Sequence, residues 1–165
     1  MAAQLEYGYD VPKGFPGGKY DLAFDNVFSA TYSGETDLNP GVVVCFDTDA
    51  TKVTAYDKAK TVAGVVLNGL IYQIEAGTAY ARKHANEGAK VEYINGDTLN
   101  VLPRGNVWVR VNDDFTMGGK VYVATDGSFT SATTTAVVTN ARWVDYDKTH
   151  GIAAVSGDFT QITNS

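Results

Sequence analysis

The stretch Asn106-Val107-Trp108-Val109-Arg110-Val111 gives the clearest indication of how this chain folds. Successive side chains of a β-strand point to opposite faces, so the three valines share one face while Trp108 and Arg110 share the other. The stretch therefore predicts a strand that turns a valine face toward a core.

Similar runs of β-branched and aromatic residues recur on both sides of this stretch, separated by turn residues. Asn68-Gly69 and Asn95-Gly96 each lie between two apolar runs, where Asn-Gly predicts a hairpin because both residues tolerate positive φ. Many short strands at close spacing are typical of a sandwich or barrel. We expect strands near residues 41–46, 62–67, 70–75, 90–94, 98–102, 106–111, 120–124, 135–139, 141–146 and 151–155.

Residues 78–87 are the one helix candidate, because Gly88 follows them at the place of a C-terminal cap, and an irregular loop is the alternative. The predicted fold is mainly β. We expect a compact β-sandwich or barrel-like domain of short antiparallel strands over residues 41–165, with at most one short helix.

The first 40 residues have a different character. Glycine and proline interrupt them repeatedly, which argues against long regular elements. They are nevertheless rich in aromatic residues, unlike a disordered linker. We predict an irregular, extended arm over residues 1–40 that lies against its own domain or against a neighbouring subunit. The aromatic residues of this stretch are Tyr7, Tyr9, Phe15, Tyr20, Phe24, Phe28 and Tyr32.

The formal net charge of −6 is concentrated near the N-terminus. Residues 1–51 hold eight acidic and two basic residues, and the remainder is balanced. An acidic chain lacks the basic footprint of a nucleic-acid-binding protein, so we expect no nucleic-acid partner. The acidic third is either a solvated face or a surface that meets a basic region of a partner.

The sequence offers no motif for catalysis, metal binding or a cofactor, and we predict none of the three. The single cysteine, Cys45, lies in an apolar run and is expected to be a small buried hydrophobe. His84 and His150 lack the spacing of zinc ligands. The run Asp47-Thr48-Asp49 lacks the glycine and glutamate of a calcium loop.

Neither a membrane span nor a signal peptide is expected. No stretch approaches the roughly 20 apolar residues that a membrane helix needs. The N-terminus has no basic region followed by an apolar one. We therefore expect synthesis in a cytoplasm and no membrane partner.

Trp108 and Trp143 each lie in a predicted strand, with Arg110 and Arg142 nearby. Exposed tryptophan and arginine are typical of interface hot spots. Core packing is the alternative, since tryptophan is usually highly buried. Trp108 is the better interface candidate because it shares a strand face with Arg110.

Several segments, in order along the chain, resemble the cement (head decoration) proteins of tailed-phage capsids. Residues 101–111 resemble the "V-L-x-x-G-x-V-W-V-x-V" strand pair of that family, and residues 119–130 are similar to its "G-x-V-Y-V … G-x-F-T" hairpin. The resemblance extends from about residue 12 to 156 and is weakest around 77–88. The other matching segments are 14–21, 40–44, 63–66, 141–143 and 151–155.

The resemblance implies a structural protein, and not an enzyme, that binds the outer surface of a phage capsid at junctions between major capsid protein subunits and stabilises the head. It implies a virion location on the capsid exterior after synthesis in the host cytoplasm. The implied partners are the major capsid protein and further copies of the chain, with a homotrimer favoured over a homodimer.

Two other functions remain open at this stage. One is another virion-surface binding module, such as a tail or fibre component or a carbohydrate-binding β domain. The other is a small hydrolase with a dispersed site. Under the cement interpretation, we hypothesise that the capsid or partner contacts come from Tyr7, Tyr9, Phe15, Tyr20, Asp21, Trp108 and Arg110.

Overall fold

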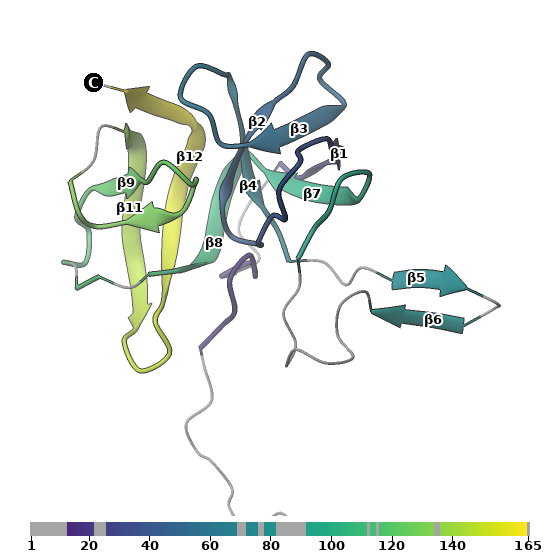
Figure 1. Cartoon of the computed structure of the whole chain (residues 1–165). Coiled ribbons are helices and arrows are strands. Elements are labelled where there is room, and N and C mark those ends of the chain that lie inside the picture. The colour runs from purple at the N-terminus through teal and green to yellow at the C-terminus, as the bar shows by residue number, and fades with distance from the viewer. Residues whose placement is uncertain are drawn as a thin grey trace, which may run out of the picture.

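The computed structural model describes residues 13–21, 26–68, 72–75, 78–81, 92–111, 113–114, 116–133 and 136–164. Every regular secondary-structure element within these ranges is a β-strand (Figure 1). They are β1 (Phe28–Tyr32), β2 (Val43–Phe46), β3 (Lys52–Ala55), β4 (Val62–Val66), β5 (Tyr72–Glu75), β6 (Thr78–Ala81), β7 (Thr98–Leu102), β8 (Arg104–Arg110), β9 (Val121–Val123), β10 (Phe129–Thr130), β11 (Ala136–Asp147) and β12 (Ile152–Asn164). The mainly β class predicted from the sequence is confirmed.

One part of the fold is a closed barrel with the strand order β1-β3-β2-β4-β7. β1 closes the barrel by pairing in parallel with β3 and antiparallel with β7. Two buried tyrosines help to fill its interior. The hydroxyl of Tyr32 donates to the Thr36 carbonyl at 2.6 Å, and that of Tyr93 donates to the Leu67 carbonyl at 2.8 Å. Each ring is thus buried without leaving its polar atom unsatisfied.

The other part is a five-stranded sheet with the order β10-β9-β11-β12-β8, which stands beside the barrel in Figure 1. The chain passes from barrel to sheet at Pro103, between β7 and β8. The largest apolar cluster contains residues of both parts, including Leu102 of the barrel and Val109 of the sheet. Trp143 belongs to this cluster, and its indole N–H donates to the Lys120 carbonyl at 3.0 Å.

Some predicted strands have different limits in the structure. The strands expected over 135–139 and 141–146 are one strand, β11, which passes two register shifts against β12 without ending. Such irregularities bend a strand and increase its twist. β1 lies within the residues predicted to form an arm, yet it is a barrel strand. The division into an arm over 1–40 and a domain over 41–165 stays a prediction.

The helix expected over residues 78–87 is wrong for the part that the structure describes. Thr78–Ala81 is β6 and pairs antiparallel with β5, while residues 82–87 lie outside the described residues. Cross-strand pairing has overridden the local helix preference, as tertiary context often does. In the part of the chain that the structure describes, no helix is long and apolar enough to cross a membrane.

The Asn95-Gly96 turn is present, but it does not join a hairpin. Gly96 has a φ of 90°, and the Asp97 N–H donates to the Ile94 carbonyl at 3.0 Å. The preceding residue Tyr93 bridges Leu38 instead of β7. The other expected hairpin turn includes Gly69, which lies outside the described residues.

Cys45 is fully buried in β2, and burial raises the pKa of its thiol. We therefore expect a thiol reagent to modify the native protein at a small fraction of the rate for a free thiol, because the thiolate is the reactive form. In denaturant, one thiol per chain should react rapidly. Fast modification of the native protein would contradict the buried position.

Candidate functional site

Residues 13–21 lie along the outer edge of the five-stranded sheet. From here on, the arm means this stretch, which is shorter than the arm predicted over residues 1–40. Lys19 forms an antiparallel bridge with Val107 of β8. The Trp108 N–H donates to the Gly18 carbonyl at 2.8 Å, and the Tyr20 N–H donates to the Asn106 carbonyl at 3.1 Å. The arm therefore adds a short extended segment to β8 and covers part of an edge that would otherwise be open to pairing.

Gly17 joins the arm to both parts of the fold. Its N–H donates to the Trp108 carbonyl in the sheet, and its carbonyl accepts from the Asn68 N–H beyond β4, both at 2.8 Å. Its φ is 75°, a conformation that glycine adopts without steric cost. A Cβ atom on Gly17 would lie 2.6 Å from the Asn68 nitrogen. The crossing thus requires glycine for two separate reasons.

Trp108 lies beneath the arm. A Cβ atom on Gly14 would lie 2.4 Å from the indole nitrogen, so the Gly14 backbone rests directly on the ring. The Tyr20 ring also packs against the indole, with its centroid 5.4 Å from that of Trp108. Together with Ile152 and Ala154, Trp108 forms a small apolar cluster separate from the main core, and it is only 5% exposed.

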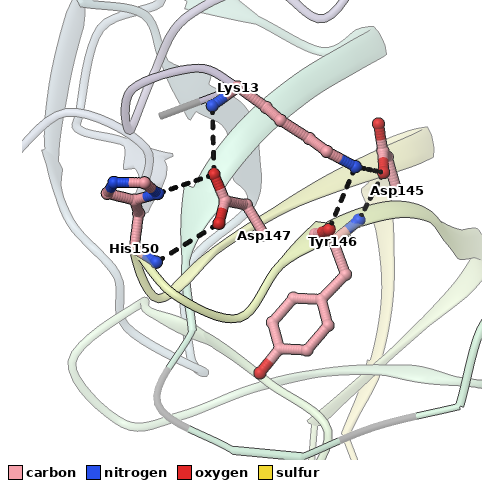
Figure 2. Close-up of polar contacts among 5 residues, drawn as sticks. All are labelled: Lys13, Asp145, Tyr146, Asp147 and His150. Carbon is pink, nitrogen blue, oxygen red and sulfur yellow. Dashed lines mark hydrogen bonds and ion pairs between the residues drawn. The ribbon is translucent and has the colours of Figure 1, made fainter. Parts of the chain in front are cut away.

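The arm begins at a cluster of polar contacts on β11 and the turn that follows it (Figure 2). Lys13 Nζ donates to Asp145 Oδ1 at 2.9 Å, and the Lys13 backbone N–H donates to Asp147 Oδ2 at 3.1 Å. The same oxygen of Asp147 lies 2.9 Å from His150 Nδ1. We call Lys13, Asp145, Asp147 and His150 the latch.

Lys13 and Asp145 stabilise each other's charged forms, although the neighbouring Asp147 carboxylate opposes the charge on Asp145. The hydrogen bond to Asp145 raises the pKa of Lys13, and the same bond lowers the pKa of Asp145. The pKa of Asp147 is lowered chiefly by the Lys13 backbone N–H, with a further contribution from His150. Lys13 is half exposed, so the ion pair fixes a geometry more than it adds to the free energy of unfolding.

These pKa shifts predict how the Lys13–Asp145 contact depends on pH. A lowered carboxylate pKa adds stability above the unfolded value near 4, which is lost as the pH falls through the folded value. A raised lysine pKa adds stability below about 10.4, which is lost as the pH rises through the folded value. We expect the Lys13 ammonium resonance in NMR spectra to keep its bound position between these limits. A change near neutral pH that persists in His150→Gln would contradict this.

The structure places five of the seven predicted contact residues. Phe15 is 57% exposed and Tyr20 is 37% exposed. Asp21 accepts a hydrogen bond from the Asn106 side chain at 2.7 Å, and Arg110 is exposed at the end of β8. Trp108, in contrast, is buried by the arm. Tyr7 and Tyr9 lie outside the described residues.

The latch is the part of the site that sequence reasoning missed. Lys13 and Asp145 are 132 residues apart in the chain, and an ordinary lysine gives no sign of such a partner. The repeated glycines at 14, 17 and 18 were a usable signal, because glycines within an aromatic segment mark places where the backbone approaches another group closely.

The acidic residues of the N-terminal third that the structure describes lie on different elements of the fold. Asp21 lies on the arm, whereas Asp47 and Asp49 lie in the turn between β2 and β3 of the barrel. Ser33 and Lys60 contact Asp47, and the hydrogen bond from Ser33 is the main cause of its lowered pKa. Both interpretations of the acidic third, a solvated face and a surface that meets a basic region of a partner, stay predictions.

The described residues contain no group of three or more His, Cys, Asp or Glu that could hold a metal ion. The arm and latch provide instead main-chain hydrogen bonds, an aromatic contact and paired charges. These features define a β protein in which residues 13–21 are held on the edge of a sheet.

The comparisons with known proteins give this class a name. The profile of the phage structural cement protein family (E217 gp24/Pam3 gp6) matches residues 3–163, so the chain belongs to that family. A chain in the solved capsid of Myoviridae phage XM1 has a similar fold, with a TM-score of 0.64 at 19% identity, covering 96% of this chain and 99% of that one.

A second solved structure is more distant. The head fiber gp8.5 N base of bacteriophage phi29 gives a TM-score of 0.44 at 11% identity, covering 84% of this chain and 98% of that chain. No curated protein matches the sequence. The family match thus identifies the chain as a structural cement protein, and the first solved structure agrees with its fold.

Proposed function

We propose that this cement protein binds the outer surface of a phage capsid at junctions between major capsid protein subunits and so stabilises the head. The observation that carries the proposal is the family match over residues 3–163. It is supported by the surface of the arm, which carries two exposed aromatic side chains, Phe15 and Tyr20. The protein acts as a non-enzymatic part of the virion.

A cement protein gains from attachment at several points. Several weak contacts within one oligomer raise the effective affinity far above that of a single contact. We infer a homotrimer at positions of local three-fold symmetry, with a homodimer as the alternative, because closed cyclic assemblies are the rule. Each copy would then offer its own N-terminal segment to a neighbouring capsid subunit.

We assign the direct contacts to the exposed aromatic and charged residues near the N-terminus. The proposed set is Tyr7, Tyr9, Phe15, Tyr20, Asp21 and Arg110, of which Phe15 and Tyr20 present exposed ring surface. Trp108 contributes indirectly, since it supports the arm from below. A carbohydrate-binding face built on tryptophan has no support, because Trp108 and Trp143 are both buried.

Co-sedimentation with capsids that lack the endogenous cement protein tests this function. We expect saturable binding at a fixed ratio to the major capsid protein, and that ratio distinguishes trimer from dimer sites. Deleting residues 1–12 should weaken the binding, whereas deleting 1–20 would also uncover Trp108 and confuse the result. An unaltered chain that does not bind capsids at any salt concentration would refute the function.

A further inference from the structure

We propose that the outer face of the five-stranded sheet docks on a carboxylate-bearing region of a neighbouring capsid subunit, and that Arg104, Arg110 and Arg142 recognise that region. The outer face is the one that carries Trp108 and is turned away from the main core. The inference rests on the proposed function and extends it, because it names the face that meets the partner and the chemistry of the partner's surface.

The alternation of β8 places two of these arginines on the outer face. Val107 and Val109 belong to the main core, and successive residues of a strand point to opposite faces. Arg104 and Arg110 therefore share the outer face with Trp108, and the register with β12 is continuous between them. Both arginines are exposed, and their Cα atoms are about 20 Å apart along the strand.

The cross-strand register adds the third arginine. Arg142 of β11 lies opposite Ser156 of β12, which in turn lies opposite Asn106 of β8. Directly opposed residues of paired strands share a face. Arg142 is also exposed, and it lies about 10 Å from β8, the width of two strand spacings. The three side chains thus fit within the roughly 800 Å² that one partner contributes to a standard interface.

The three arginine side chains form no hydrogen bond, ion pair or ring contact with any residue that the structure describes. Several lysines behave differently. Lys13, Lys60 and Lys148 each pair with an aspartate, at 2.9, 3.5 and 2.8 Å respectively. The chain has 19 acidic residues against 13 basic ones, so a shortage of carboxylates does not explain the difference.

Carboxylates that lie beside the arginines in the sheet are bound by other donors. Asp158 is directly opposite Arg104, yet its Oδ1 accepts hydrogen bonds from the backbone N–H and the hydroxyl of Thr160, at 3.1 and 2.6 Å. Asp147 lies in the same row of the sheet as Arg110 and is held within the latch. The fold therefore leaves these guanidinium groups available to a partner.

The arm adds aromatic surface to the same face. Trp108 of β8 and Asp145 of β11 lie in one row across the sheet. Gly14 rests on the indole at one end of this row, and Lys13 binds the carboxylate at the other end (Figure 2). Tyr20 packs against the indole and is 37% exposed. The face thus combines arginine with tyrosine, two residue types that are enriched in interface hot spots.

The chemistry of the face favours a carboxylate on another protein. The planar guanidinium group binds carboxylate and phosphate through paired hydrogen bonds. The net charge of −6 opposes the approach of a nucleic acid, which leaves carboxylate. A second copy of this chain is the weaker candidate, because carboxylates of its turns already accept hydrogen bonds from neighbouring hydroxyl groups, at Asp47, Asp49 and Asp126. The occupant is therefore an acidic region of a capsid subunit.

Charge reversal at Arg142 tests the face in the co-sedimentation assay. Lys52→Glu is the matched control, because it reverses one charge at an exposed position on β3 of the barrel. We expect Arg142→Glu to weaken capsid binding by about tenfold or more, and Lys52→Glu to stay within about twofold of the unaltered chain. Both side chains are exposed, so both variants should keep the urea denaturation midpoint of the unaltered chain.

Lysine substitutions identify the occupant. A water-soluble carbodiimide couples a lysine amine to a carboxylate held against it and does not couple a guanidinium group. On saturated capsids, Arg104→Lys, Arg110→Lys or Arg142→Lys should give a cross-link from the substituted position to an aspartate or glutamate of the major capsid protein, located by mass spectrometry. Cross-links only to a second copy of this chain would overturn the proposed occupant. No cross-link from any of the three positions would overturn the carboxylate contact.

The outcomes separate this inference from the function on which it rests. Equal binding by Arg142→Glu and Lys52→Glu would overturn the docking face and leave the cement function intact. Binding of the unaltered chain to a double-stranded DNA oligonucleotide, lost in Arg142→Glu, would assign the face to phosphate and also overturn the inference. Failure of the unaltered chain to bind capsids would overturn both the inference and the function.

Discussion

Replacing Trp108 by alanine is expected to lower the free energy of unfolding by about 3–5 kcal/mol, the usual cost of truncating a buried tryptophan. Trp108 is 5% exposed, and its indole packs with Ile152 and Ala154 of the sheet and with Gly14 and Tyr20 of the arm. Its loss leaves a cavity that the arm backbone cannot fill. The midpoint of urea denaturation measures the change in stability.

The same variant should release the arm before the protein unfolds. Hydrogen exchange at the Gly17 and Tyr20 amides, which bond to β8, should approach the rate of an unstructured chain, because their protection depends on the docked arm. Trp108→Phe keeps an aromatic ring beneath Gly14 and should lose less stability and retain most of the protection. Full protection of both amides in Trp108→Ala would contradict the supporting role of this residue.

Gly17→Ala should be the most damaging small substitution in the arm. Alanine at a φ of 75° costs roughly 1–2 kcal/mol in backbone strain. Its Cβ would also lie 2.6 Å from the Asn68 nitrogen, a backbone atom that cannot turn aside. Undocking of the arm from the sheet relieves both the backbone strain and the collision. The largest effects should therefore be faster hydrogen exchange at the arm amides and weaker capsid binding, with a smaller fall in the free energy of unfolding.

Gly118→Ala is the matched control for this prediction. Gly118 has the same φ of 75°, but a Cβ atom there meets nothing within 4 Å. The backbone strain is therefore common to both variants, and the difference between them measures the collision with Asn68. Equal changes in hydrogen exchange at the arm amides and in the free energy of unfolding for Gly118→Ala and Gly17→Ala would contradict the close contact between Gly17 and Asn68.

The sequence was informative where a residue's neighbours on the strand determine its position. The alternation around Trp108 correctly gave a strand with its valines in a core, and the segment 98–102 is β7 as expected. The side of the sheet that Trp108 faces was also correct. What covers that face could not be derived, because the covering residue Gly14 is nearly 100 positions away and carries no side chain.

Local signals failed where long-range pairing decides the structure. The helix expected over 78–87 rests on composition, yet Thr78–Ala81 pairs with β5. β1 was missed because its residues Phe28–Tyr32 follow an irregular stretch and pair with β3 and β7, both distant in sequence. The latch was missed for the same reason. Contacts between residues far apart in sequence depend on the order in which the strands pair, and local residue patterns do not reveal that order.

The arm connects the fold to the proposed cement function. The barrel and the sheet supply a rigid body, and Gly17 ties the arm to both of them. The latch then holds the Lys13 end of the arm on β11. Under the proposed function, the barrel and the sheet hold the arm in place, and the arm presents Phe15 and Tyr20 to a neighbouring subunit.

The most direct test of this account is an electron cryomicroscopy reconstruction of capsids that lack the endogenous protein and have been saturated with this chain. We predict density for this chain on the outer surface of the shell, at junctions between major capsid protein subunits, with the exposed Phe15 and Tyr20 of the arm facing a capsid subunit. A reconstruction with no density for this chain at these junctions, or with the arm directed away from the capsid subunits, would contradict the account.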